Sequence, residues 1–305
     1  MRLLFHTADI FTSRIFGGNP LAVFPDARGL DDARMLSIAR EFNLSETVFV
    51  LPPESEANTR RLRIFTPAAE LPFAGHPTVG AAYVLAAIGE IALTGESTQI
   101  IFEEGAGLVP VTIRAQNGKP VFAQLTAPKA PEIGPPPPSR VALAQILSLE
   151  VADLMGGTMA PQAVSVGLPI LFVPLRDRDA VVRTQVRLDL WAATLKQYWA
   201  PQIMVLAKDP VLPTSNFHAR VFVPGLSIPE DPATGAAAAA LGGYLGAREP
   251  AAQGTFTYVV EQGFEMGRES FLHIEVDKSH GSVSAIRVGG HAVLVSHGEF
   301  VMNGD

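Results

Sequence analysis

The stretch RIFTPAAELPFAGHPTVGAA at positions 63–82 has a shortened copy, RVFVPGLSIPEDPATGAA, at positions 220–237. Each copy begins with an arginine and an apolar strand, passes a proline and a short loop, and ends in a turn that opens an alanine-rich segment. Allowing a two-residue deletion, the prolines and glycines of the turns align, and His76 falls opposite Asp231. The chain is therefore predicted to consist of two related halves, each with one ionisable side chain at an equivalent turn.

Length and composition favour two globular domains. The 305 residues suit two domains of about 150 residues each, and a hydrophobic content of 48% excludes a largely disordered chain. The segment 131–140 is the expected linker, because its run of four prolines favours extended polyproline geometry. We therefore expect domains at 1–130 and 131–305, with the last strand of the chain as a candidate to complete the first domain.

Charge and residue types exclude several classes of function. A net charge of −7 argues against a surface that follows nucleic-acid phosphates. The three arginines at positions 60, 61 and 63 are interpreted as a solvated strand face or a small-anion contact. The absence of cysteine excludes disulfides, thiolate metal sites and cysteine nucleophiles. No apolar run reaches the roughly 18–20 residues that span a bilayer. The N-terminus does not resemble a signal peptide, so we expect a soluble, cytoplasmic protein.

Hydrophobic patterning predicts strands and helices in both halves. Strands are expected at 2–11, 19–25, 47–51, 62–65, 99–103, 108–114 and 121–126, and then at 162–166, 170–174, 202–206, 218–223, 256–260, 271–277, 282–287 and 291–296. Helices are expected at 31–42, 78–89, 139–155, 188–199 and 234–247. The segments 78–89 and 234–247 are apolar on every side, which is typical of a helix buried all round. The predicted fold is α+β, with two similar domains that are each a β-barrel-like sheet around a central apolar helix.

Glu46 is the first candidate for chemistry, in the segment FNLSETVFV at 42–50. Its carboxylate lies between the expected end of a helix and the start of an apolar strand, where we expect poor solvation. Such a setting suits a general acid or base. A capping role with Ser45, or a surface ion pair, explains the same residue without catalysis.

The second candidate is the turn Gly75-His76-Pro77-Thr78 before the first alanine-rich segment. The start of a helix offers unpaired N–H groups and the positive end of its dipole, which hold carboxylates and developing oxyanions. Gly75 allows close approach of a ligand to the backbone, and His76 can carry a proton. A histidine that only caps the helix is the alternative.

The third candidate is Asp231-Pro232-Ala233-Thr234-Gly235 in the second half. Aspartate is a favoured N-cap and proline suits the first helical turn, so capping alone accounts for this turn. Capping does not require two such turns at corresponding places, and the internal match therefore favours function. Two halves that face each other would bring both helix starts to one cleft, where a small anionic ligand meets two sets of backbone donors.

Other motifs point to no cofactor or metal. The run Gly105-Ala106-Gly107 lacks the third glycine and the following helix of a dinucleotide-binding loop. The four histidines after position 270 lack the spacing of metal ligands. No Gly-x-Ser-x-Gly elbow supports a serine hydrolase.

Five segments together resemble the PhzF-like, phenazine-biosynthesis family. They are GGNPLAVFPDA (17–27), FNLSETVFV (42–50), FTPAAELPFAGHPTVGAA (65–82), EDPATG (230–235) and QGFEMGRES (262–270), and they occur in the family's order. The resemblance implies a diaminopimelate-epimerase-like fold with two domains related by a pseudo-twofold axis and the active site between them. It also implies a homodimer, a small-molecule carboxylate substrate, and no cofactor or metal.

The resemblance also implies roles for individual residues. Glu46 would move a proton between carbons of the substrate, while His76 and Asp231 would line the site and assist proton relay. The remaining implied positions bind substrate: Asn19, Ser45, Gly75, Thr234, Gly235 and Ala236. Gly75 and Gly235 among them would present backbone donors to the substrate carboxylate.

Ala236 stands where the family's isomerase usually has serine, so a hydroxyl at the substrate is missing. The leading hypothesis is a cofactor-independent isomerase that acts on a small carboxylate-bearing metabolite through Glu46. Two alternatives stay open: a non-catalytic metabolite-binding protein that has kept the fold, and lyase or hydrolase chemistry in the same cleft.

Overall fold

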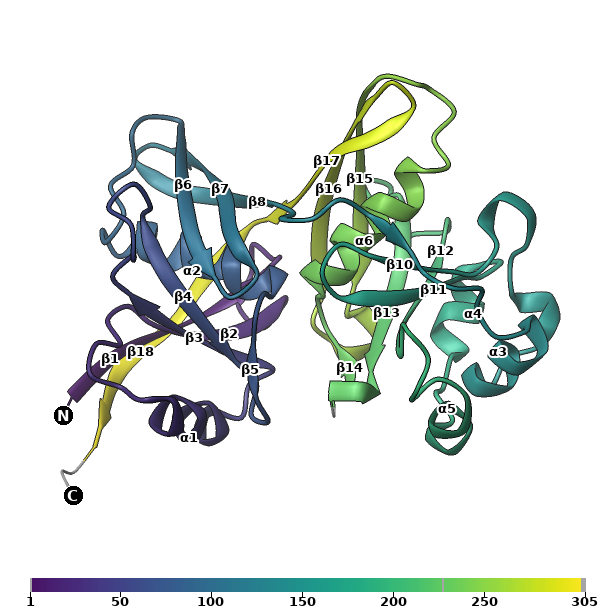
Figure 1. Ribbon diagram of the computed structural model, residues 1–305, viewed down its shortest axis with the longest axis horizontal. Coiled ribbons are helices and arrows are strands. Elements are labelled where there is room, and N and C mark those ends of the chain that lie inside the picture. Colours follow the sequence, from purple (N-terminus) through teal and green to yellow (C-terminus); the bar gives the residue numbers. More distant parts are fainter. Residues whose placement is uncertain (1, 227, 303–305) are drawn as a thin grey trace. The chain divides into compact units, whose positions relative to one another are not determined.

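The computed structural model describes residues 2–226 and 228–302, and the chain forms two compact units (Figure 1). The first unit comprises Met1–Pro128 with Gly289–Asp305, and the second comprises Lys129–Val288. The final strand β18 (Ala292–Val301) pairs antiparallel with the first strand β1 (Arg2–Ile10), which places it in the first unit. The second unit is therefore inserted before the last strand of the first.

In the first unit, β1 is followed by β2 (Asn19–Phe24), α1 (Asp32–Phe42), β3 (Glu46–Leu51), β4 (Arg60–Phe65), β5 (Glu70–Leu71), α2 (Gly75–Ala87), β6 (Ser97–Glu104), β7 (Gly107–Gln116) and β8 (Lys119–Thr126). Strands β2 and β3 are parallel, as are β4 and β6, and the other neighbours are antiparallel.

The second unit contains β9 (Glu132–Ile133), α3 (Arg140–Leu147), β10 (Gln162–Ser165), β11 (Pro169–Pro174), α4 (Arg178–Arg183), α5 (Leu188–Thr194), β12 (Gln202–Ala207), β13 (Phe217–Val223), β14 (Ile228–Asp231), α6 (Gly235–Gly246), β15 (Gly254–Gln262), β16 (Ser270–Ser279) and β17 (Ser282–Gly290). Short 3₁₀ turns lie at Val151–Asp153, Gly157–Met159, Pro224–Leu226 and Phe264–Met266.

Both units repeat one order of strand pairings. The parallel pair β2–β3 corresponds to β11–β12, and the parallel pair β4–β6 corresponds to β13–β15. Each short strand, β5 or β14, pairs with the strand before it and leads into an apolar helix. The prediction of two similar domains in an α+β fold is confirmed.

The apolar helices α2 and α6 are each enclosed by the strands of their own unit (Figure 1). α2 contacts β1, β2, β3, β7, β8 and β18, and α6 contacts β10, β11 and β16. Every residue of α6 is buried. Close packing explains why these helices contain small residues. At Gly80 of α2, for example, a Cβ atom would lie 2.4 Å from Cδ2 of Leu21 in β2. This central position is the physical reason that both helices lack a polar face.

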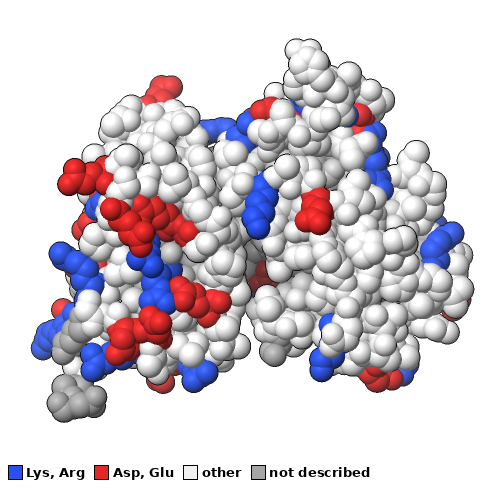
Figure 2. All heavy atoms as spheres, in the orientation of Figure 1, with Lys and Arg blue, Asp and Glu red and all other residues white. Residues whose placement is uncertain are grey.

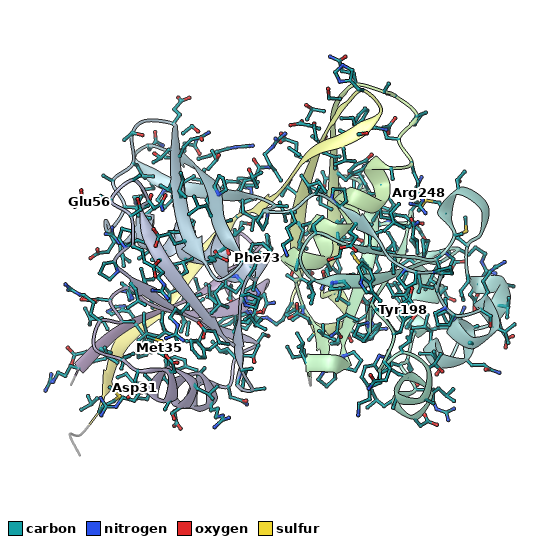
Figure 3. The ribbon with its side chains drawn as sticks, in the orientation of Figure 1. Asp31, Met35, Glu56, Phe73, Tyr198 and Arg248 are labelled. Carbon is teal, nitrogen blue, oxygen red and sulfur yellow. The ribbon has the colours of Figure 1, made fainter. Side chains whose placement is uncertain are left out.

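The surface helix α1 packs with one face only. Asp31 is its N-cap and accepts a hydrogen bond from the backbone N–H of Arg34, while Met35 lies between the helix and the strands (Figure 3). Asn43 ends the helix in the left-handed conformation. Here the helix expected at 31–42 is confirmed.

Two expected helices are shorter than predicted, and one helix was missed. The helix expected at 139–155 ends at Leu147, because Ser148 adopts a left-handed conformation with φ of 58°. The helix expected at 188–199 ends at Thr194. The six-residue helix α4 was not predicted, and the expected linker 131–140 contains the short strand β9, which pairs with β10.

The arginines of β4 form ion pairs on the surface of the first unit, where Figure 2 shows basic and acidic side chains side by side. Arg61 lies 2.6 Å from Glu54, and Arg63 lies 2.6 Å from both Asp32 and Glu70. These carboxylates neutralise the basic cluster and agree with its interpretation as a strand face. Among the described residues, no helix has the length and apolar character needed to cross a membrane.

Candidate active site

Three elements of the first unit bring Asn19, Glu46 and His76 together. Asn19 begins β2 and Glu46 begins the neighbouring parallel strand β3, while His76 is the second residue of α2. Nδ1 of His76 lies 2.8 Å from Oε2 of Glu46 and 3.4 Å from Nδ2 of Asn19. Ser45, half-buried, directly precedes Glu46.

This arrangement sets the chemistry of the imidazole. The Glu46 carboxylate only accepts hydrogen bonds when ionised, so Nδ1 of His76 carries the proton that is donated to it. The Nε2 atom of His76 is buried and has no hydrogen-bond partner among the described residues. The side chains of His76 and Glu46 are only 4% and 13% exposed. A buried polar atom without a partner is unusual in native proteins and suits contact with a ligand.

The two central helices have no side-chain cap at their first turn. Side chains of Asp31, Ser139 and Asp177 cap α1, α3 and α4, whereas α2 and α6, like the short surface helix α5, have no side-chain cap. Their first N–H groups are therefore left for another acceptor, and the start of a helix favours an anion.

The structure does not support the capping alternative at either turn. The N-cap residues are Ala74 and Thr234, so His76 lies inside α2 and Asp231 lies before α6, at the end of β14. α2 begins at Gly75, three residues before the predicted start, because proline is compatible with a first helical turn.

The expected match of His76 with Asp231 is also corrected. Because α2 begins at Gly75 and α6 begins at Gly235, the residue that corresponds to His76 is Ala236. Asp231 ends β14, and its counterpart at the end of β5 is Leu71. The two ionisable side chains therefore come from different positions of the repeated motif.

The turn before α6 is held by a hydrogen-bond network in the second unit. The Thr234 hydroxyl donates to Oδ2 of Asp231 at 2.5 Å. The buried Gln262 side chain donates to the carbonyl of Asp231 at 2.6 Å and accepts from the backbone N–H of Thr234 at 3.2 Å. This network orients Asp231 and Thr234 beside Gly235 and Ala236, which open α6.

Two buried polar residues near these turns were not singled out from the sequence. Gln262 belongs to the motif QGFEMGRES, but its side chain gives no local signal. Glu104 ends β6, is 9% exposed, and has Oε1 2.7 Å from the hydroxyl of Thr78 in α2. Burial raises the pKa of Glu104 to about 8, and the negative charge of Glu46 adds to this rise against the lowering effect of the Thr78 bond.

A second histidine–carboxylate cluster lies in the second unit. Nδ1 of His218 lies 2.8 Å from Glu261, and its Nε2 lies 2.7 Å from Glu265. Burial opposes the charged imidazolium, but hydrogen bonds to both carboxylates outweigh burial and raise the pKa of His218 to about 9. Because both ring nitrogens are bonded, this cluster is a closed structural clamp.

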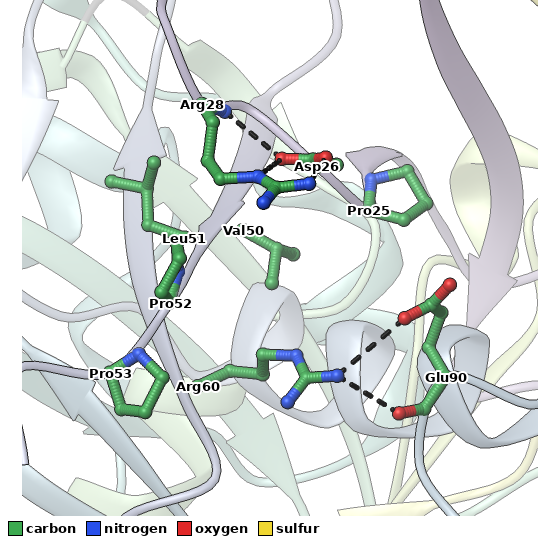
Figure 4. Close-up of a pocket in the computed structure, with 9 residues that line it drawn as sticks. All are labelled: Pro25, Asp26, Arg28, Val50, Leu51, Pro52, Pro53, Arg60 and Glu90. Carbon is green, nitrogen blue, oxygen red and sulfur yellow. Dashed lines mark hydrogen bonds and ion pairs between the residues drawn. The ribbon is translucent and has the colours of Figure 1, made fainter. Parts of the chain in front are cut away.

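A surface hollow in the first unit is lined by residues that form a separate set from Asn19, Glu46 and His76 (Figure 4). Its lining residues are Pro25, Asp26, Arg28, Val50, Leu51, Pro52, Pro53, Arg60 and Glu90. Arg28 is paired with Asp26 and Arg60 with Glu90, so these charges are already matched. In the described part of the chain, no three histidine or carboxylate side chains gather as a group that could hold a metal ion.

A model of the PhzC-PhzF family, described as phenazine biosynthesis-like protein, matches residues 8–298. The chain belongs to this family. An uncharacterized isomerase of Mesorhizobium japonicum is 40% identical over 296 residues, which are 95% of this chain and 96% of that protein. A trans-2,3-dihydro-3-hydroxyanthranilate isomerase of Pseudomonas aeruginosa is 31% identical over 298 residues, which are 95% and 96% of the two chains.

Solved structures agree with the family match. A PhzF-family phenazine biosynthesis protein of Bacillus anthracis has a TM-score of 0.86 and 28% identity, covering 99% of this chain and 100% of that one. A hydroxyproline epimerase from Agrobacterium vitis has a TM-score of 0.65 at 12% identity, covering 98% and 91%, and so shares the fold alone. The predictions of a PhzF-like isomerase and an epimerase-like fold are confirmed.

Proposed function

We propose that this protein is a cofactor-independent isomerase that moves a proton on a small carboxylate-bearing metabolite, with Glu46 as the general acid and base. One observation carries the proposal: a nearly buried carboxylate is paired with a buried histidine at the uncapped start of a helix. A carboxylate within hydrogen-bond reach of a histidine can take up a proton and return it.

The reaction is a transfer within one molecule. Glu46 takes a proton from an acidic carbon, the electron pair delocalises into the substrate, and Glu46 then delivers a proton, which can exchange with solvent, to another carbon. No atoms are gained or lost, and no oxidant or reductant is required. His76 donates Nδ1–H to Glu46 and so orients the carboxylate, while its Nε2 is directed at the substrate.

Backbone groups stabilise the charge that develops. The N–H groups of Gly75 and His76 open α2 without a side-chain cap, and one such donor is worth about 2.7–4 kcal/mol where measured in other enzymes. In the second unit, we assign substrate binding and orientation to Asp231, Thr234 and Gly235, as the family resemblance implies. Their action on the same substrate as Glu46 stays a prediction.

The names of the relatives suggest the first compound to test. Trans-2,3-dihydro-3-hydroxyanthranilate, the substrate named for the Pseudomonas aeruginosa relative, carries a carboxylate of the required kind. Other small carboxylates can be screened by thermal shift, because a ligand that binds the folded state raises its stability by mass action.

Glu46→Gln tests the proposal, because glutamine keeps the shape of the side chain but cannot accept the proton. We expect turnover to fall by about 10²–10⁴-fold with substrate binding retained. Glu56→Gln makes the same chemical change on an exposed turn and serves as the matched control (Figure 3). Wild-type turnover in Glu46→Gln would remove Glu46 from the mechanism.

Ala236 favours one alternative, a metabolite-binding protein that has kept the fold without catalysis. In the first turn of α6, Gly235 is followed only by alanines, so no residue of this turn carries a hydroxyl group. Solvent deuterium separates the two functions. An isomerase washes deuterium into the substrate it binds, whereas a binding protein releases its ligand unlabelled.

A further inference from the structure

Glu104 is a buried carboxyl group that the mechanism above does not use. It ends β6 and lies against the first turn of α2, where Oε1 is 2.7 Å from the Thr78 hydroxyl. Its Oε2 is buried and has no hydrogen-bond partner among the described residues. An ionised carboxylate in this setting would lack most of the donors that normally stabilise its charge.

The contacts of Thr78 indicate where the proton lies. Its hydroxyl oxygen is 2.7 Å from the carbonyl oxygen of Ala74 and 2.7 Å from Oε1 of Glu104. A hydroxyl has one proton to donate, and a carbonyl oxygen can only accept. Threonine in a helix commonly donates to the carbonyl four residues earlier, which is Ala74 here. The proton in the hydrogen bond between Thr78 and Glu104 must then belong to the carboxyl group of Glu104.

The second unit supports this assignment with a neutral side chain at the corresponding place. β15 corresponds to β6 in the order of pairings, and Gln262 ends β15 as Glu104 ends β6. Gln262 also bonds to the threonine at the start of the central helix, donating to the Thr234 hydroxyl at 3.1 Å. A neutral side chain that donates to a threonine therefore occupies the position in β15 that Glu104 occupies in β6.

The charged neighbour of Glu104 is Glu46 of β3, whose negative charge opposes ionisation of Glu104. On α2, His76 is bonded to Glu46, and Thr78 is uncharged. On β7, the residues in register with the end of β6 are Gly107 and Leu108, which do not titrate.

The remaining neighbour strand is β4. Arg61 of β4 is in register with Glu103, and its guanidinium is bonded to Glu54 at 2.6 Å. Burial and the charge of Glu46 together raise the pKa of Glu104 to about 8.

We propose that Glu104 is a positioning residue that remains a neutral carboxylic acid and donates a hydrogen bond to Thr78. The negative charge of the site is then left on Glu46. The role in turnover rests on the proposed function of Glu46. A second negative charge beside Glu46 would oppose both an anionic substrate and the charge that develops on it. Turnover should therefore fall as Glu104 ionises, which gives kcat/KM an alkaline limb near pH 8.

Infrared spectroscopy of the substrate-free protein tests the proton directly. The carbonyl band of a protonated carboxylic acid should disappear as the pH rises through about 8. Glu104→Gln should lack this band, and the control Glu56→Gln should keep it. No band that titrates in this range, or a band that persists in Glu104→Gln, overturns the proposal.

Variants of Thr78 keep the test valid if Glu104→Gln does not fold. Thr78→Ser retains the hydroxyl and should leave the acid band in place. Thr78→Val removes the acceptor and should shift the band toward that of a carboxyl group without a partner. If the acid band lay at the same frequency in Thr78→Ser and Thr78→Val, Glu104 would not donate a hydrogen bond to residue 78.

Measurements of turnover in two variants distinguish a failure of this inference from a failure of the proposed function. The side chain introduced by Glu104→Gln is neutral, like the protonated acid and like the natural Gln262. This variant should therefore keep its turnover at neutral pH and lose the alkaline limb of kcat/KM. An unchanged alkaline limb in Glu104→Gln overturns the positioning role. An active Glu46→Gln variant removes the proposed function instead, and it leaves the infrared result untouched.

Discussion

The two central helices begin alike but differ in the chemistry around their first turns. α2 and α6 both start at a glycine without a side-chain cap. At α2, Glu46, His76 and Glu104 surround the turn, and two of their atoms lack partners in the described part of the chain. At α6, Gln262 and Thr234 bond to Asp231. The same backbone device thus lies beside a histidine–carboxylate pair in one unit and beside a hydrogen-bonded polar turn in the other.

The buried histidines show the same contrast. His76 has one ring nitrogen bonded to Glu46 and the other without a partner among the described residues, whereas His218 has a carboxylate at each nitrogen. A histidine whose two nitrogens are occupied stabilises the fold, while one with a spare nitrogen can act on a ligand.

Replacing His76 should give the largest loss of activity. His76→Asn keeps an amide N–H near the position of Nδ1 and removes Nε2, so Glu46 retains a donor. We expect turnover to fall by about 10²–10⁴-fold with little change in melting temperature. The control is His280→Asn, on an exposed turn whose φ of 52° suits asparagine. A normal rate in His76→Asn would end the contrast between the two histidines.

Replacing His218 should instead reduce stability. His218→Asn leaves two carboxylates without their cation, which we expect to lower the free energy of unfolding by about 3–5 kcal/mol. Since the fold raises the pKa of His218, its contribution is complete below pH 6.5 and is lost as the pH rises through about 9.

The stability difference between wild type and His218→Asn should therefore shrink over that range of pH. Denaturation at a series of pH values measures it, again with His280→Asn as the control. A difference that grows with pH would contradict the charged clamp.

Ala236→Ser should have the smallest effect. Serine adds a hydroxyl at the second residue of α6, where the family's isomerase usually has one. One added hydrogen bond is worth about 0.5–1.5 kcal/mol, so KM should fall by up to about tenfold. Steady-state kinetics measures this change, with thermal melting to check the fold. An unchanged KM would show that residue 236 does not contact the substrate.

The apolar helices and most strands could be predicted because their signals are local. Alanine and glycine on every side of 234–247 predict a buried helix without knowledge of its neighbours. The start of α2 was misplaced by three residues, because Pro77 is compatible with both a loop and a first helical turn. The helix expected to end at 155 stops early because Ser148 adopts a backbone conformation that its sequence does not signal.

The candidate site was predictable only in part. Glu46, His76 and Asp231 lie in motifs that the sequence displays, and the structure brings Glu46 and His76 to 2.8 Å. The counterpart of His76 is Ala236, which became clear only when both helix starts were known. Glu104 gave no signal, because a strand with two adjacent glutamates does not reveal which one faces inward.

The amino-acid sequence alone determined the two repeated halves and their apolar central helices, and it displayed the candidate acid–base residues in the family motifs. These follow from periodicity and residue type, which act over a few neighbouring positions. Only the tertiary structure decided which buried polar atoms have partners, as for Glu104 with Thr78 and His218 with its two carboxylates. Those contacts join strands and helices far apart in the chain, so packing sets the electrostatic environment of each group.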